Sequence, residues 1–133
     1  MAGLTLKSVK CLVVEDEPTI LRLVTLVLED MGCETLAAAD AEGALNILSE
    51  QVPDVLIADV RLPGMNGVDL ANRVRSSDRH SSTAVLLMSA YGEPSHHGCD
   101  GFLAKPFDIE SLTEFVEPFL ADSAGPAAAG KKS

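Results

Sequence analysis

Five short apolar runs are distributed along the chain, and each is bounded by charged or turn-forming residues. Continuous runs of apolar and β-branched residues are typical of strands that are buried on both faces of a sheet. The pattern therefore predicts five strands, in the ranges 10–14, 34–38, 54–59, 83–89 and 101–104.

Apolar residues recur at helical spacing between most of these runs and after the last one. Pro18 suits a first helical turn and Gly32 supplies a stop, while Asp40 and Asp108 can each cap a helix. Pro118 removes one backbone hydrogen bond near the end of the last helix, so we expect a frayed or kinked final turn there. The helical spacing covers residues 20–31, 44–48, 68–75 and 112–119.

Buried strands that alternate with helices indicate a parallel sheet covered on both faces. With right-handed crossovers, such a chain forms a doubly wound α/β fold, which places its sites at the carboxyl ends of the strands. We expect one globular domain over 9–121, preceded by a short extension over 1–8. The residues 122–133 are small, polar and interrupted by Pro and Gly, which predicts a flexible tail or linker.

Composition narrows the classes of function. The net charge of −10, from 20 acidic and 10 basic side chains, disfavours direct binding to nucleic acid. No apolar run approaches the ~20 residues of a membrane span, and the first residues do not resemble a signal peptide. We therefore expect a cytoplasmic protein that does not bind membranes. Cys11 and Cys33 lie among apolar residues, which favours small core side chains over a disulfide framework.

Polar residues with complementary chemistry follow four of the predicted strands. The acids 15–17 follow the first strand, Asp59 ends the third, Ser89 ends the fourth and Lys105 follows the fifth. Any one of these alone is explained as a solvated loop charge or a helix cap. Because the carboxyl ends of parallel strands meet at one edge of the sheet, together they indicate a site. Clustered carboxylates there repel one another unless a cation joins them, and Mg²⁺ prefers such oxygen ligands.

Four segments resemble the signature segments of the response-regulator receiver domain of two-component signalling: VVEDEP, LIADVRLPGMNG, LLMSAY and GFLAKPF. The resemblance spans about residues 9–120, and the combination of D-x-x-L-P-G-M-N-G with K-P-F is highly specific. It implies a flavodoxin-like, CheY-like sheet of five parallel strands in the order 2-1-3-4-5.

The resemblance also implies a phosphorylation site. Asp59 corresponds to the phosphoacceptor, whose carboxylate takes a phosphoryl group from a phosphohistidine to form an acyl phosphate. Asp16 corresponds to a direct Mg²⁺ ligand, together with Asp59 and the backbone carbonyl of Arg61. Glu15 stands where the family more often has Asp, and it is expected to act through a metal-bound water.

Further roles follow from the same resemblance. Ser89 and Lys105 correspond to the residues that meet the phosphoryl oxygens, and Pro106 corresponds to a cis-bonded proline. Phe102 occupies the aromatic switch position, whose rotamer follows the movement of Ser89. Phosphorylation is then expected to bias a two-state interaction surface.

The implied partners are a sensor histidine kinase or a histidine phosphotransfer protein, and a downstream protein effector. A slow autodephosphorylation is expected, and the oligomeric state is left open. The alternative is an interaction module of the same fold that works without phosphorylation. A phosphohydrolase is disfavoured because Arg61, two residues after Asp59, is not a second acid for general acid-base chemistry.

The stretch between the fourth and fifth strands departs from the family. Its twelve residues, 89–100, contain Gly, Pro and a histidine pair but few apolar residues, so we expect a mobile loop or one turn where most receivers have a helix. A zinc site built from His96, His97 and Cys99, with His80 as a fourth ligand, is disfavoured because no typical ligand spacing is present.

Overall fold

The computed structural model describes residues 8–92 and 99–120. Five parallel strands form one sheet in the order β2-β1-β3-β4-β5, which confirms the predicted fold. The strands are β1 (Lys10–Val14), β2 (Glu34–Ala38), β3 (Val55–Asp59), β4 (Ala84–Ser89) and β5 (Gly101–Ala104).

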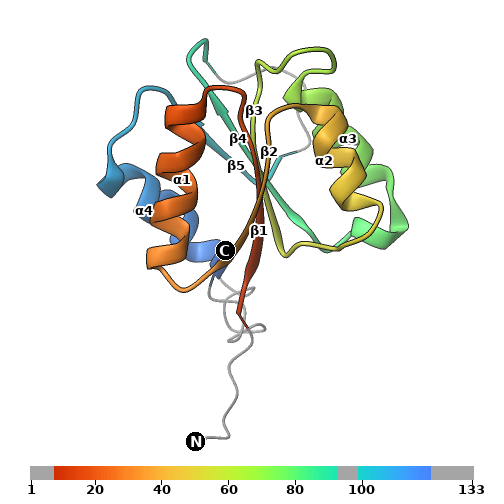
Figure 1. Ribbon diagram of the computed structural model, residues 1–133, viewed down its shortest axis with the longest axis horizontal. Helices are drawn as coiled ribbons and strands as arrows, with labels where there is room; N and C mark the ends of the chain where they lie inside the picture. The colour runs from red at the N-terminus through yellow and green to blue at the C-terminus, as the bar shows by residue number, and fades with distance from the viewer. Residues whose placement is uncertain (1–7, 93–98, 121–133) are drawn as a thin grey trace, which may run out of the picture.

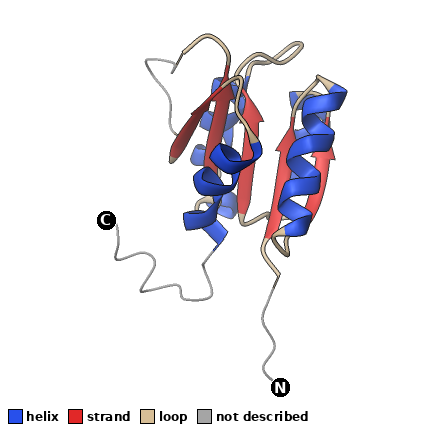
Figure 2. Ribbon diagram, turned by 90° about the vertical axis from the view of Figure 1, so that its left-hand side faces the viewer, coloured by secondary structure: helices blue, strands red, loops and turns tan. Residues whose placement is uncertain are grey.

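Helices cover both faces of this sheet (Figures 1 and 2). One layer consists of α1 (Pro18–Asp30) and α4 (Ile109–Leu120), and the other of α2 (Ala41–Leu48) and α3 (Gly67–Ser76). A 3₁₀ turn, Asp78–His80, lies between α3 and β4. None of the helices in the described residues is long and apolar enough to cross a membrane.

Side-chain caps fix the starts of the helices. Asp40 accepts a 2.7 Å hydrogen bond from the amide of Gly43, and Asp108 accepts one of 2.8 Å from Ser111. Both caps were predicted. Asn66 caps α3 through the amide of Asp69 at 2.9 Å, a role that the sequence pattern did not reveal. The structure continues α4 past Pro118 to its end, so fraying of that last turn stays a prediction.

The core is divided by the sheet into two layers. Along β1, Cys11 and Val13 face the cluster under α1 and α4, whereas Leu12 and Val14 face the cluster under α2 and α3. This burial on both faces explains why the strands read as continuous apolar runs.

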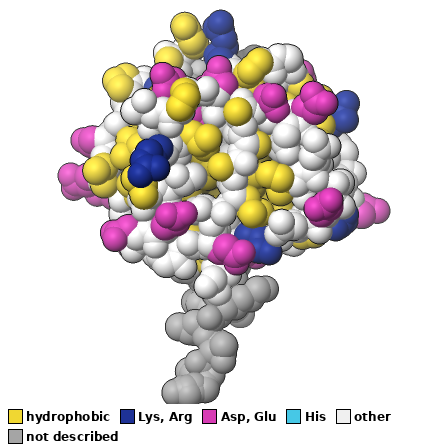
Figure 3. Space-filling view, viewed as in Figure 1, with side chains coloured by type: hydrophobic (Ala, Val, Ile, Leu, Met, Phe, Trp, Pro, Cys, Tyr) yellow, Lys and Arg dark blue, Asp and Glu magenta, His cyan; other side chains and the backbone are white. Residues whose placement is uncertain are grey.

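Cys11 and Cys33 are buried thiols, and burial raises the pKa of each, so both act as small core residues. Acidic side chains are spread over the surface in Figure 3.

The link between β4 and β5 contains no helix in the parts that the structure describes, residues 90–92 and 99–100. His96 and His97 lie outside the described residues, as does the middle of the predicted loop, 93–98. Cys99 packs against the core cluster under α2 and α3. His80 is buried, with Nδ1 3.0 Å from the Ser77 hydroxyl and Nε2 3.0 Å from the Leu48 carbonyl. Both ring nitrogens are therefore engaged, and His80 is not available as a zinc ligand.

Candidate functional site

Three carboxylates lie together at the carboxyl edge of the sheet. Glu15 and Asp16 follow β1, and Asp59 is the last residue of β3, the strand paired with β1. One oxygen from each of the three lies within 4.8 Å of the others. The sequence argument that strand ends converge is thus correct for these three side chains.

Lys105 joins the buried members of this acidic group. Its Nζ lies 2.8 Å from Oε1 of Glu15 and 2.9 Å from Oδ2 of Asp59. The amide of Lys105 donates to the carbonyl of Ser89 at 2.9 Å, which extends the β4–β5 ladder by one residue. This hydrogen bond fixes the position of the Lys105 backbone. The peptide bond between Lys105 and Pro106 is cis.

Burial and hydrogen bonding have opposite effects on the pKa values of Glu15 and Lys105. Burial raises the pKa of Glu15, against the lowering effect of its hydrogen bond with Lys105. Burial lowers the pKa of Lys105, but its hydrogen bonds to Glu15 and Asp59 outweigh this effect, so the pKa is raised overall. Lys105 therefore remains a cation at neutral pH. One cationic lysine therefore lies beside a cluster of three carboxyl groups.

The carboxylate of Asp59 is held on both sides. It is only 5% exposed; Oδ2 accepts from Lys105, and Oδ1 accepts from the amide of Arg61 at 3.3 Å. The neighbouring amide of Val60 donates to the Met88 carbonyl at 2.8 Å, which ties the end of β3 to β4. The orientation of this side chain is thus set by backbone as well as by charge.

The two acids after β1 differ in what their oxygens contact. Both oxygens of Glu15 are engaged, Oε1 with Lys105 and Oε2 with the amide of Glu17 at 3.0 Å. Asp16 is exposed, and its carboxylate forms no hydrogen bond within the described ranges. A cation at this edge would therefore find Asp16 the most accessible of the three carboxylates. Carboxylate oxygens are the ligands that Mg²⁺ takes, so the donor set fits that ion.

Ser89 and Phe102 occupy the same face of β4 and β5. Ser89 pairs with Ala104, and Leu87 pairs with Phe102 one step further into the sheet. The Ser89 hydroxyl is 1% exposed and accepts from the amide of Tyr91 at 3.0 Å, which leaves its own hydrogen free to donate to a ligand. Phe102 is half-buried and packs against the core cluster under α2 and α3.

The sequence model described as "Response regulator receiver domain" matches residues 11–117 of this chain. The chain belongs to the response regulator receiver family. It is thus a phosphoaccepting domain of two-component signalling, and the fold and family inferred from the sequence motifs are confirmed. Receiver domains generally bind Mg²⁺ at an acidic pocket, and in this chain Glu15, Asp16 and Asp59 form an acidic cluster.

Individual relatives agree with this assignment. The chain is 32% identical over 117 residues to Sporulation initiation phosphotransferase F of Bacillus subtilis, covering 84% of this chain and 93% of that protein. It is 34% identical over 115 residues to Chemotaxis protein CheY of Pseudomonas aeruginosa, with coverages of 81% and 93%. The solved structure of CheY4 of Vibrio cholerae superposes with a TM-score of 0.79 at 31% identity, covering 86% of this chain and 100% of that one.

Gly67 is a supporting residue of this receiver domain that the sequence reasoning missed. A Cβ at this position would lie 2.2 Å from the carbonyl oxygen of Asp59, closer than any real contact. The Gly67 amide donates to the Val60 carbonyl at 2.8 Å, so the first residue of α3 packs directly against the backbone at the end of β3. The glycine in the motif GMNG was the available signal, but only the tertiary contact explains it.

A Gly67→Ala variant is expected to lose about 2 kcal/mol of unfolding free energy, the usual scale for overpacking. The added methyl group must displace either α3 or the backbone of Asp59, so phosphorylation should slow as well. Urea unfolding followed by circular dichroism measures the first effect. Gly43→Ala is the matched control, since its Cβ meets only side chains, at 3.1 Å and beyond. Equal stability of the two variants would contradict the proposed packing.

Arg61 and Tyr91 form a second feature that the sequence did not reveal. The guanidinium carbon of Arg61 lies 4.6 Å from the centroid of the Tyr91 ring, a cation–π contact between the loops that follow β3 and β4. Both side chains are exposed. This contact joins the loop after Asp59 to the loop after Ser89.

Proposed function

We propose that Asp59 is the residue that this receiver domain phosphorylates. The observation that carries the proposal is the contact of Lys105 with both Glu15 and Asp59 inside the acidic cluster. An oxygen of Asp59 attacks the phosphorus of a phosphohistidine, the phosphorus–nitrogen bond breaks, and the imidazole leaves with the bonding pair. The product is an acyl phosphate, and Lys105 neutralises part of the charge that develops on the phosphoryl oxygens.

The proposed Mg²⁺ ligands are Asp16, Asp59 and the backbone carbonyl of Arg61, with Glu15 acting through a bound water. Glu15 is the most deeply buried of the three acids, at 1% exposed, which supports the indirect role for this residue. A bound Mg²⁺ supplies charge neutralisation between the phosphoryl group and the carboxylates. Glu15 is one methylene longer than the Asp more common in the family, and we expect this difference to loosen Mg²⁺ binding without abolishing it.

Ser89 and Phe102 form the proposed switch. The Ser89 hydroxyl donates to a phosphoryl oxygen, and its movement opens space into which the Phe102 ring turns. The register supports this coupling, since the two residues lie on one face of adjacent strands. Pro106, cis-bonded to Lys105, directs the chain away after the lysine.

The partners that we propose are a histidine kinase or histidine phosphotransfer protein as donor, and a protein effector that reads the switch. Receiver domains in general interact with such proteins. We take residues 9–121 as the domain that performs this function, with 1–8 and 122–133 as its extension and tail, and the cytoplasm as its compartment. The matched region, 11–117, supports these limits.

The metal role of Asp16 has a direct test. We expect Asp16→Asn to weaken Mg²⁺ binding by about 100-fold, since it removes a charged ligand rather than an outer-shell partner. Amide chemical shifts followed during a Mg²⁺ titration measure the affinity. Asp30→Asn, which neutralises an exposed acid at the end of α1, should bind Mg²⁺ as the parent protein does. Equal affinity in all three proteins would remove Asp16 from the site.

The proposed function is tested by incubation with phosphoramidate, a small phosphodonor, with and without Mg²⁺. We expect the intact mass to increase by one phosphoryl group only when Mg²⁺ is present. A mass that never changes, with Mg²⁺ shown to bind, would favour the alternative of an interaction module that works without phosphorylation.

A further inference from the structure

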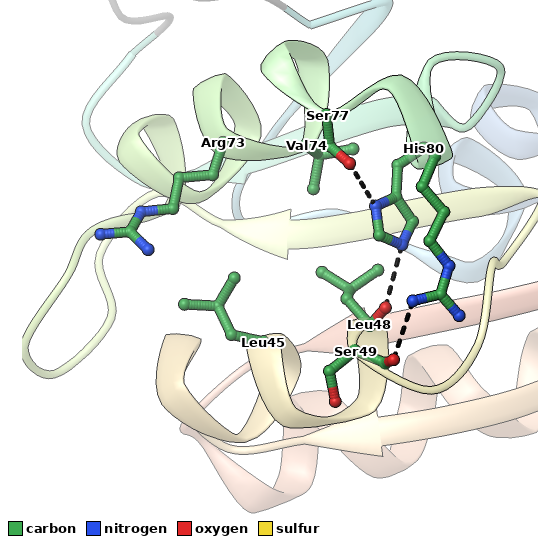
Figure 4. A pocket seen from close by; sticks show the side chains of 8 residues that line it. Leu45, Leu48, Ser49, Arg73, Val74, Ser77 and His80 are labelled. Atoms are coloured by element: carbon green, nitrogen blue, oxygen red, sulfur yellow. Dashed lines mark hydrogen bonds between the residues drawn. The ribbon is translucent and has the colours of Figure 1, made fainter.

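A second site lies between α2 and α3, away from the acidic edge. The two helices and the 3₁₀ turn line an open groove of about 310 Å³, with Leu45 on one side and Val74 and Arg73 on the other (Figure 4). Leu48 precedes β3 and His80 precedes β4, so this groove lies at the amino ends of the strands, opposite Asp59. We call it the α2–α3 groove.

The floor of the groove is aliphatic, and hydrogen bonds of His80 hold one end of it in place. Leu45, Leu48 and Val74 supply the apolar surface. At one end, His80 connects the Ser77 hydroxyl to the Leu48 carbonyl, which ties the 3₁₀ turn to the end of α2. His80 and Ser77 therefore hold the groove in shape, and their polar atoms already have partners. The remaining polar lining consists mainly of two arginines.

These two arginines have no acidic partner. Arg73 is exposed and makes no hydrogen bond or ion pair with any residue that the structure describes. Arg79 donates only to a neutral acceptor, the Ser49 carbonyl, at 2.8 Å from Nη1, and forms no ion pair in the described part of the chain. Arg75 and Lys105, by contrast, both contact carboxylates.

We propose that the α2–α3 groove binds an acidic segment of a partner protein. One aliphatic side chain of that segment enters between Leu45, Leu48 and Val74, and flanking carboxylates pair with Arg73 and Arg79. Guanidinium groups match carboxylates in shape as well as charge, and the aliphatic floor adds burial of a single side chain. The groove therefore combines the two complementary features that a short acidic motif requires.

The same observations disfavour a nucleic acid as the occupant. An extended polyanion would follow the surface beyond two arginines and meet a protein whose net charge is −10. A short peptide with carboxylates only beside its apolar side chain avoids that repulsion. Because the groove shares no residue with the acidic edge, the interaction does not depend on Asp59, and its failure would leave the phosphorylation proposal unaffected.

The test is a selection of random displayed peptides on the unphosphorylated full chain, with Arg73→Glu as the counter-selected variant. We expect the enriched peptides to carry Asp or Glu on both sides of a Leu, Ile or Phe. Their affinity should fall about tenfold or more on Arg73→Glu, the scale of one reversed charge-assisted pair. Arg22→Glu is the matched control, because Arg22 is also an exposed helical arginine but lies on α1.

Amide chemical shifts of the protein, recorded with and without an enriched peptide, locate the surface that the peptide contacts. Amide shift changes should concentrate at Leu45, Leu48, Val74 and His80, and binding should weaken with added salt. Thermal unfolding of Arg73→Glu should match the parent protein, which separates lost binding from lost folding. The proposal is overturned if no peptide is enriched, if the enriched peptides are not acidic, if Arg73→Glu and Arg22→Glu bind them equally, or if the shifts map to another surface.

Discussion

The Asp59→Asn variant is expected to take up no phosphoryl group when it is incubated with phosphoramidate and Mg²⁺. An amide is not a nucleophile toward phosphorus. Among the residues that the structure describes, only Asp59 has a carboxylate held by both Lys105 Nζ and the Arg61 amide. The parent protein should gain one phosphoryl group under the same conditions. Intact-mass spectrometry of both proteins, recorded before the acyl phosphate hydrolyses, measures the difference.

Asp69→Asn is the matched control for this experiment. Asp69 is an exposed acid in the first turn of α3, and its replacement makes the same chemical change outside the acidic edge. This control should be phosphorylated as the parent protein is. A phosphoryl group that persists on Asp59→Asn would show that another residue is the acceptor.

The Lys105→Met variant is expected to lose about 3 kcal/mol of unfolding free energy at neutral pH, because it leaves two buried carboxylates without their cation. Glu15 is 1% exposed and Asp59 5%, so water cannot easily replace the lysine. The same change should slow phosphorylation, because it removes the positive charge next to the reacting oxygen. Lys10→Met is the control, since Lys10 Nζ contacts only the neutral Oε1 of Gln51, at 3.0 Å, and should cost less than about 1 kcal/mol.

The effect of Lys105→Met should also depend on pH. The folded pKa of Lys105 is raised above the ordinary value of 10.5, so its contribution to stability is present below that pH and is lost as the pH rises through the raised pKa. On the acid side, losing the lysine raises the pKa of Glu15 further, so protonation restores stability to the variant. The difference in stability between the two proteins should therefore be largest near neutral pH and smaller at both extremes.

Urea unfolding of the parent protein and of Lys105→Met, from acid to alkaline pH, measures the difference in their unfolding free energies. A stability difference that is independent of pH would contradict the ionic role of Lys105 and would assign its effect to packing of the aliphatic stem. The Lys10→Met control, measured in parallel, corrects for the general alkaline loss of lysine charge.

The positions of the strands were readable from the sequence because each is buried on both faces. The ranges of β1, β2 and β5 agree with their predicted ranges, and β3 and β4 differ by one residue at their starts. The acidic site was predictable for the same reason: once parallel strands are assigned, their carboxyl ends must share an edge. The resemblance to receiver domains then attached a role to each residue there, but it contains no information about distances.

What the sequence did not reveal depends on contacts between distant segments. Gly67 appears ordinary until its distance from the Asp59 carbonyl is known, and the contact of Arg61 with Tyr91 joins two separate loops. His80 was considered as a metal ligand because histidine suggests one, whereas burial beneath α2 gives it two structural hydrogen bonds. The unpaired state of Arg73 likewise follows only from the fold, because many acids are available in the sequence.

Chemical location of the phosphoryl group in the parent protein tests most directly whether Asp59 accepts it. Borohydride reduces an aspartyl phosphate to homoserine, and sequencing of the reduced protein by mass spectrometry locates that residue. We predict homoserine at position 59 alone, and only in samples that contained Mg²⁺. Homoserine at position 16, or at any residue outside the acidic cluster, would contradict the proposed mechanism.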